Sequence, residues 1–327
     1  MILVPRDRLP SDSGARYGAL RDYFCDKDAT ATLTPDGWSL ELAWPDGAER
    51  HVDPQLPAGL AWWGDGVRLE TMALATKRQG RLYRALYDTW TLYSWSEWLA
   101  RRGPDALEDL TILHVDDHRD LGSPRLFQDG DAWIDPIAGE VCDLSRPSSV
   151  KAAILSGALG MGSFLTPFLH LVPRADVRHL CQPPKAIGTT DYRTRLTTTP
   201  DSLLSPERIR PAVDLEPAPG ATGPGCYRIT PDLDAWLEDL GPGPILLHID
   251  MDYFNNRYDC DSDWQERPAV LDPPADQVRC KIDEMIGALS KAGATDRLED
   301  VVIAFSPGFF PAELWAEADA RLAEALG

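Results

Sequence analysis

The stretches "ILHVDDHRDL" (residues 112–121) and "LLHIDMDYF" (residues 246–254) share one design. Each is a short apolar run, followed by a His, a β-branched residue and an Asp, with another ligand-type residue two places on. Continuous apolar runs of this length predict buried strands of a parallel sheet. Active sites in such sheets form at the carboxyl ends of the strands. Because Asp116 and Asp250 end the two runs, we expect both side chains to project into one crevice.

The segments around these motifs alternate between expected strands and expected helices. Helices are predicted over residues 66–102, over most of 145–172, over 276–293 and over 311–326, and "DVVIAFSPGFF" (residues 300–310) predicts a third buried strand. This alternation predicts an α/β fold with a mainly parallel sheet covered by helices on both faces. We expect one catalytic domain over residues 66–327, with a Pro- and Gly-rich surface excursion at about 196–226.

The first 65 residues have a different pattern. Residues 31–53 alternate apolar and polar side chains and contain two "PDG" turns, which is typical of antiparallel hairpins. We therefore expect a small N-terminal β element over residues 1–65. A docking surface for a leader peptide and a lid on the sheet edge are equally open roles for it.

The bulk composition limits the class of protein. A hydrophobic content of 43% excludes global disorder, and a net charge of −20 argues against a nucleic-acid partner. The acidity suits a cationic substrate or serves solubility alone. None of the six cysteines forms a CxxC pair and the N-terminus lacks an apolar signal core, so we expect a cytoplasmic protein with reduced thiols. The uncharged segment 152–172 predicts a buried helix followed by a strand or turn, not a membrane span.

The two motifs bring four carboxylates and one imidazole together: Asp116, His118, Asp120, Asp250 and Asp252. Carboxylates this close repel one another, and a divalent metal ion is the simplest way to hold them together. Oxygen-rich sites with one imidazole suit Mn²⁺, and a pair of ions would lower the pKa of a bridging water toward neutrality. The alternative is that each Asp only forms a turn or caps a helix.

The order D-x-H-x-D and then D-x-D resembles the ureohydrolase arrangement of arginases and agmatinases. The segments "HVDDHRDL", "GSFLTP", "HIDMDYFNNR" and "FSPGFF" more closely resemble the uncharacterised-protein group that includes peptide arginases. The resemblance covers residues from about 80 to the C-terminus. It implies a three-layer αβα fold, two manganese ions, and hydrolysis of arginine side chains in a precursor peptide to ornithine and urea. It also implies that Asp116 and Asp250 bridge the metals, that His118 and Asp252 complete one site, and that Asp120 serves the other.

The chain departs from the arginase pattern in its metal ligands. Arginases take a further His ligand from an earlier strand end, whereas this chain has no His between His51 and His114. The second metal would then be completed by water, ligated by Asp88 or Glu97, weakly bound or absent. For His114 and His248, we expect hydrogen-bonded support of the site before direct ligation.

Residues for substrate recognition are harder to predict. The late strand ends at Ser306, where arginases place a guanidinium-binding glutamate. Candidates for substrate contact are Asp263, Asn255, Ser163 and Ser306, although Asp263 equally suits a solvated acidic loop and Ser163 a turn cap. His170 is a candidate proton shuttle to the leaving amine, or a buried core histidine.

Two other functions compete with a peptide arginase. One is a different C–N hydrolase on the same scaffold, agmatinase-like or deacetylase-like, acting on a small molecule. The other is a non-enzymatic binding protein that uses the acidic cluster as a structural metal clamp.

Overall fold

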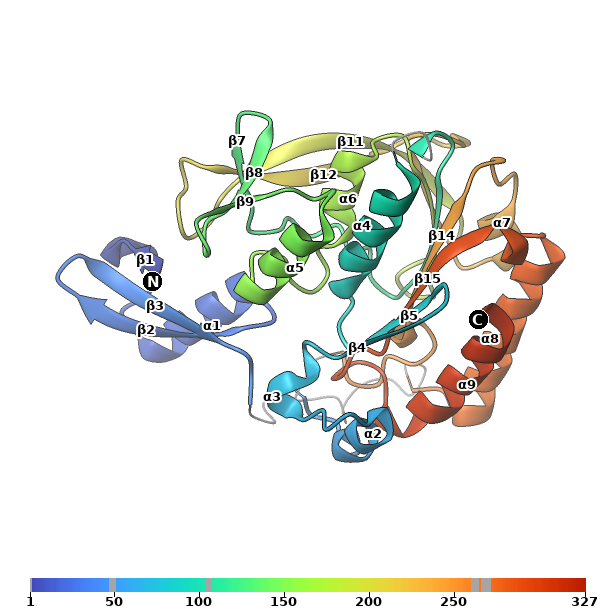
Figure 1. Cartoon of the computed structure of the whole chain (residues 1–327), viewed down its shortest axis with the longest axis horizontal. Helices are drawn as coiled ribbons and strands as arrows, with labels where there is room; N and C mark the ends of the chain where they lie inside the picture. Colours follow the sequence, from blue (N-terminus) through green and yellow to red (C-terminus); the bar gives the residue numbers. More distant parts are fainter. Residues whose placement is uncertain (1, 47–50, 104–106, 260–264, 266–271) are drawn as a thin grey trace.

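The computed structural model describes residues 2–46, 51–103, 107–259, 265 and 272–327. Within this part of the chain, nine strands form one large mixed sheet (Figure 1). Across the sheet they are β12 (Ile209–Pro217), β11 (Thr190–Pro200), β13 (Cys226–Thr230), β10 (Asp176–Leu180), β6 (Thr111–Val115), β14 (Ile245–Asp250), β15 (Leu298–Ala304), β5 (Leu82–Ala85) and β4 (Thr76–Gln79). The six strands from β13 to β5 are parallel, which confirms an α/β fold with a mainly parallel sheet.

Helices cover both faces of this sheet. In Figure 1, α4 (Trp90–Arg102), α5 (Pro147–Ser156) and α6 (Leu165–Leu171) lie on one side, and α7 (Leu233–Leu237), α8 (Ala275–Lys291) and α9 (Trp315–Leu326) lie on the other. The longest of them, α8, buries Val278, Ile282, Met285 and Leu289 along one stripe. Every residue of β6, β10 and β14 is buried, as strands covered on both faces require. The arrangement is a three-layer αβα fold.

The N-terminal residues form a separate antiparallel sheet in the order β1 (Ile2–Val4), β3 (Gly37–Ala43), β2 (Asp28–Thr34), with α1 (Ser13–Phe24) beside it. The expected hairpin is therefore present, with the first "PDG" at its turn. A small hydrophobic cluster joins Phe24 and Leu40 of this element to Phe127 and Leu204 of the main part. Consequently the N-terminal element packs against the larger fold, and the domain boundary at residue 65 stays a prediction.

The remaining elements are short. They are α2 (Leu56–Trp63), α3 (Leu69–Met72) and a small antiparallel sheet of β7 (Phe127–Asp129), β8 (Ala132–Asp135) and β9 (Glu140–Cys142). Within the described residues, no helix has the length and apolarity needed to cross a membrane. The uncharged segment 152–172 contains the end of α5, a turn and α6, as expected.

The prediction of helix throughout residues 66–102 is wrong over its middle. Residues 76–85 form the hairpin of β4 and β5, and only α3 and α4 are helical. Lys77, Arg78 and Gln79 have good helix propensity, but Gly80 adopts a φ of +61° and reverses the chain. The pairing of β5 with β15 then outweighs local propensity.

The Pro- and Gly-rich segment 196–226, expected to be a surface excursion, contains regular structure. It includes the end of β11 and the whole of β12, which form a long hairpin that extends the main sheet. Pro211 and Pro217 lie in β12, which is the last strand of the sheet. Proline is tolerated in an edge strand because its missing N–H is not needed by a further neighbour.

Candidate metal centre

The two Asp-tipped strands are neighbours in the sheet. β6 and β14 are parallel, and His114 pairs in register with His248. Since parallel strands end at the same edge, Asp116 and Asp250 leave the sheet side by side. Asp250 lines the cavity described below, whereas Asp116 is 1% exposed and is not among its lining residues, so the shared crevice stays a prediction.

Short hydrogen bonds fix the carboxylates after these strands. The backbone N–H of His118 donates to Asp116 Oδ1 at 2.5 Å, and that of Asp252 donates to Asp250 Oδ1 at 3.1 Å. The Ser306 hydroxyl donates to Asp250 Oδ2 at 2.6 Å, and His118 Nδ1 lies 2.8 Å from Asp252 Oδ2. Ser306 has a φ of +44°, a conformation that non-glycine residues rarely adopt and that often marks a functional site. The loops are thus held with their carboxylates converging.

Three histidines form a row beneath the carboxylates. His179 of β10, His114 of β6 and His248 of β14 share one register across three adjacent strands, and all three are fully buried. Their ring centroids lie 4.6 Å and 5.1 Å apart along the row. Phe164 stacks on His248 at one end, and the Tyr227 hydroxyl lies 2.8 Å from His179 Nδ1 at the other.

This row supports the loop that follows β6. His179 Nε2 lies 2.9 Å from the backbone oxygen of Asp116, and His114 Nε2 lies 3.1 Å from that of His118. His179 Nε2 is placed to donate to the Asp116 carbonyl, whereas His114 Nε2 donates to the His118 carbonyl in one tautomer and offers its lone pair to a cation in the other. The expected supporting role of His114 is therefore present, although its ring also faces the carboxylates.

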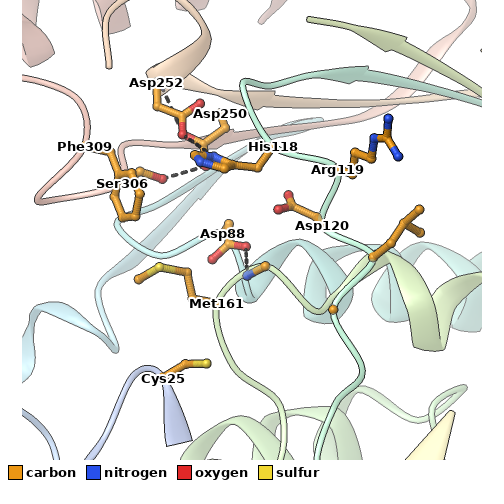
Figure 2. A pocket seen from close by; sticks show the side chains of 13 residues that line it. Cys25, Asp88, His118, Arg119, Asp120, Met161, Asp250, Asp252, Ser306 and Phe309 are labelled. Carbon is orange, nitrogen blue, oxygen red and sulfur yellow. Dashed lines mark hydrogen bonds and ion pairs between the residues drawn. The ribbon is translucent and has the colours of Figure 1, made fainter. Parts of the chain in front are cut away.

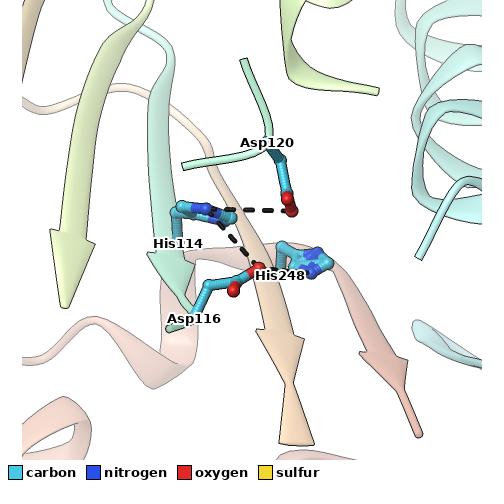
Figure 3. Close-up of side chains that lie close together, drawn as sticks. All are labelled: His114, Asp116, Asp120 and His248. Carbon is cyan, nitrogen blue, oxygen red and sulfur yellow. Dashed lines mark ion pairs between the residues drawn. The ribbon is translucent and has the colours of Figure 1, made fainter. Parts of the chain in front are cut away.

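Two groups of side chains could each hold a metal ion among the described residues. One consists of His114, Asp116, Asp120 and His248, shown in Figure 3, and the other of Asp116, His118 and Asp252. In each group, the ligand atoms lie within 4.8 Å of one another, and Asp116 belongs to both. Asp250, which the resemblance makes a bridging ligand, lies outside both groups.

Three potential ligand atoms of the first group form no hydrogen bond within the described residues. Asp116 Oδ2, Asp120 Oδ2 and His248 Nε2 are buried and lack a hydrogen-bond partner among the described residues. Asp116 Oδ2 lies 3.7 Å from His114 Nε2 and 3.8 Å from His248 Nε2. Orphaned buried polar atoms are costly, and a cation bound between them would satisfy all of them at once. Oxygen and imidazole nitrogen donors suit a divalent ion, so the residues fit a metal.

The charges of the cluster also favour a bound cation. Burial raises the pKa of Asp116, Asp120 and Asp250 well above the ordinary value, and repulsion between neighbouring carboxylates raises it further. Repulsion from Asp252 acts on both Asp116 and Asp250. Without a cation, these side chains must retain protons to coexist. A divalent ion removes that requirement by supplying positive charge.

The pKa values of the histidines at the site shift in two directions. Burial lowers the pKa of His114 to about 4 and lowers the pKa of His248 well below its ordinary value, so both rings are neutral at pH 7. Neutral imidazole is the form that binds metal. Burial acts in the same direction on His118, but the Asp252 carboxylate and hydrogen bonds to Asp116 and Asp252 outweigh it and raise the pKa of His118.

A cavity of about 450 Å³ lies beside the cluster (Figure 2). Its acidic lining consists of Asp88, Asp120, Asp250 and Asp252, and its less polar lining includes Cys25, Leu121, Met161 and Phe309. His118 and Ser306 also face it. Cys25 follows α1, so the N-terminal element forms part of the wall. The cavity can therefore admit a small group to the edge of the metal ligands.

Several predicted substrate residues lie elsewhere. His170 packs at the end of α6, with Nε2 3.0 Å from the Ala212 carbonyl, and does not line the cavity. Ser163 closes a turn with Gly160 behind the cavity lining, and Asn255 binds Asp272 at 2.9 Å. Ser306 does line the cavity. Asp263 lies outside the described residues.

Of the two residues considered as an extra metal ligand, only Asp88 lines the cavity. Glu97 pairs with Arg78 at 3.1 Å, whereas Asp88 lies in the cavity but outside both ligand groups. Two histidines of the sheet, His114 and His248, belong to the first ligand group and could supply the further imidazole ligand. The role of His179 was missed from the sequence, although "VRHL" (residues 177–180) repeats the pattern of an apolar strand with a His near its end.

Two loops that line the cavity touch at Gly122. Its N–H donates to the Gly162 carbonyl at 2.9 Å, and a Cβ at position 122 would lie 2.7 Å from the same oxygen. We expect Gly122→Ala to destabilise the fold by about 1–3 kcal/mol, measured by urea denaturation, because backbone must move. The control is Gly287→Ala in α8, where a Cβ meets no atom within 4 Å and a gain of about 0.4–1 kcal/mol is expected. Equal stability of both variants would contradict this account.

Comparison with protein-family models and with curated proteins gives no match to this chain.

Proposed function

We propose that this protein is a metal-dependent hydrolase that converts arginine side chains within a peptide to ornithine and releases urea. The observation that carries the proposal is the pair of ligand groups that share Asp116 at the edge of the cavity. Two ions held by a common carboxylate are typical of hydrolytic two-metal sites. We propose Mn²⁺ as the ion because the ligands are mainly carboxylates with imidazole. The resemblance of the motifs to peptide arginases supports the same reaction.

The protein residues would divide the work as follows. One ion would be held by Asp116, Asp120, His114 and His248. The other would be held by Asp116, His118 and Asp252. Bound metal of this kind supplies Lewis acidity, which activates water near neutral pH. Ser306 keeps Asp250 oriented toward the cavity through its hydrogen bond.

The cavity lining would select and bury the reacting group. Met161, Leu121 and Phe309 present apolar surface that excludes bulk water, while the carboxylates attract a cation. In the overall reaction, water adds to the guanidinium carbon and the bond from that carbon to the side-chain nitrogen breaks. The oxygen leaves in urea, and both protons of water are accounted for in the ammonium group of ornithine.

The test is mass spectrometry of arginine-containing peptides incubated with the Mn²⁺-loaded protein. We expect a metal-dependent mass change from arginine to ornithine, with urea as the second product, and loss of conversion in Asp250→Asn. Glu97→Gln, which removes a similar carboxylate outside the cavity, is expected to keep the activity. Bound metal without conversion of any arginine peptide would overturn the reaction proposed, and failure to bind metal would overturn the metal centre itself.

A further inference from the structure

Two acidic residues of the cavity lining, Asp88 and Asp250, lie outside both ligand groups. Asp88 lies between β5 and α4 and is 3% exposed. The Gly162 N–H donates to Asp88 Oδ2 at 2.7 Å. Burial and neighbouring carboxylates raise the pKa of Asp88 well above its ordinary value, so a cation beside it would be stabilising.

No cationic side chain within the described residues pairs with Asp88. The charged residues that shift its pKa, Asp120 and Asp26, are of the same sign, and Arg119, which lines the same cavity, forms no ion pair with it. Other buried carboxylates of this protein have partners: Asp300 binds Arg78 at 2.8 Å, and Asp176 binds Arg178 at 2.9 Å. A buried carboxylate needs a counter-charge, and at Asp88 the cavity is the place from which one can arrive.

Asp88 is the carboxylate of this cavity that remains open to a substrate. Its neighbour Asp120 belongs to the first ligand group, and Asp250 accepts from the Ser306 hydroxyl at 2.6 Å. Figure 2 shows Asp88 and Asp120 facing the space between them. A planar cation with several N–H donors would meet the Asp88 carboxylate there.

The opposite lining suits an aliphatic chain. Cys25 and Met161 lie on the side of the cavity away from Asp252, and Leu121 and Phe309 complete the less polar lining. A side chain with a methylene stem and a cationic end matches this division. We infer that Asp88 is the specificity residue that binds the cationic end of the substrate side chain. The inference rests on the proposed function, because it assigns the guanidinium of that substrate to Asp88.

The experiment uses the Mn²⁺-loaded full chain and two unreactive probes, Nα-acetyl-lysine amide and Nα-acetyl-norleucine amide, which differ at the charged end. We expect isothermal titration to show about tenfold or stronger preference of the wild type for the lysine probe. Asp88→Asn should reduce the preference to about one, raise the KM for an arginine peptide about tenfold or more, and leave the metal content unchanged. Glu97→Gln, the matched control, should retain the preference.

The outcomes separate this inference from the proposed function. A preference that survives in Asp88→Asn would overturn the inference, as would its absence in the wild type. Loss of metal from Asp88→Asn would also overturn it, because Asp88 would then be a metal ligand. A wild type that prefers the lysine probe but never converts arginine would refute the proposed reaction and uphold Asp88 as a cation-binding residue. If the Asn variant does not fold, Asp88→Glu is decisive, since it should retain the preference through its charge.

Discussion

Replacing Asp116 with Asn is expected to abolish metal binding at both ligand groups. Asp116 is common to the two groups, so one substitution removes a carboxylate ligand from each. Changes in residues that only support metal ligands cost about 10- to 100-fold in affinity, and loss of a shared ligand should exceed that. Titration calorimetry and metal analysis of the dialysed protein give the measurement, and turnover of an arginine peptide should disappear with the metal.

In the metal-free protein, the same substitution is expected to raise the stability of the fold. Asp116 is buried among Asp250 and Asp252, and repulsion from both raises its pKa. Asn has nearly the same shape without the charge, so metal-free Asp116→Asn should melt at a higher temperature than the metal-free wild type. With Mn²⁺ present, the order should reverse, because ligand binding stabilises only the protein that retains its ligands.

Asp117→Asn is the matched control for this pair of measurements. Asp117 is adjacent in sequence, but its Oδ2 lies 2.7 Å from Lys185 Nζ and accepts from Asn256 at 2.8 Å, away from both ligand groups. It should bind metal like the wild type. Metal retained by Asp116→Asn, or lost equally from both variants, would contradict the assignment of the ligands.

Metal binding is expected to release protons and to strengthen as the pH rises. The pKa values of the proposed ligands Asp116 and Asp120 are raised by burial and by repulsion from neighbouring carboxylates, and these groups must lose protons to bind a cation. For each proton released, the affinity should rise by about tenfold per pH unit. Calorimetry in buffers of different ionisation enthalpy measures the number of protons directly. Binding that releases no protons between pH 6.5 and pH 8, a window of about 1.5 units, would contradict the charge state inferred for the cluster.

Chelation should therefore destabilise the protein more at higher pH. A carboxylate whose folded pKa is raised destabilises the metal-free fold as the pH rises from its ordinary value of 3.8 through the raised value. The buried histidines act in the opposite sense, because their stabilising neutral form is lost as the pH falls from 6.5 toward about 4 for His114. Above pH 6.5, the contribution of His114 and His248 is constant, while that of the carboxylates and of His118, whose pKa is raised, still falls with pH. The melting temperature of the chelated protein should fall with pH there, while the loaded protein should change less.

The sequence was sufficient for the sheet and the carboxylate motifs because both depend on local patterns. The run "LTILHVD" (residues 110–116) is apolar and short, and its Asp stands where a parallel strand must end. The β4–β5 hairpin was missed because Lys77 and Arg78 favour a helix. In the structure they pair with β5, which in turn pairs with the distant strand β15. The β11–β12 hairpin was missed because proline is a reliable breaker only where a strand has neighbours on both sides.

The cavity was less predictable than the ligands. Asp88 and Met161 come from loops far apart in the chain, and no periodicity connects them. His114 and His248 were recognised as facing the site, but their closeness to Asp120 and Asp116 depends on strand order. That order places β14 beside β6, although seven strands, β7 to β13, lie between them in the chain. Recognition residues depend on such tertiary geometry, which one sequence without relatives does not encode locally.

The histidine row has a consequence for how the protein acquires its metal. The rings of this row, His179, His114 and His248, meet only when three strands from distant parts of the chain have paired in one register. A slip of one residue would turn a ring to the other face of the sheet. Contacts between such distant segments form slowly, since chain closure must precede them. On the proposed function, an ion would find no complete ligand group until these strands have paired. It would then slow the opening of the completed sheet rather than guide its assembly.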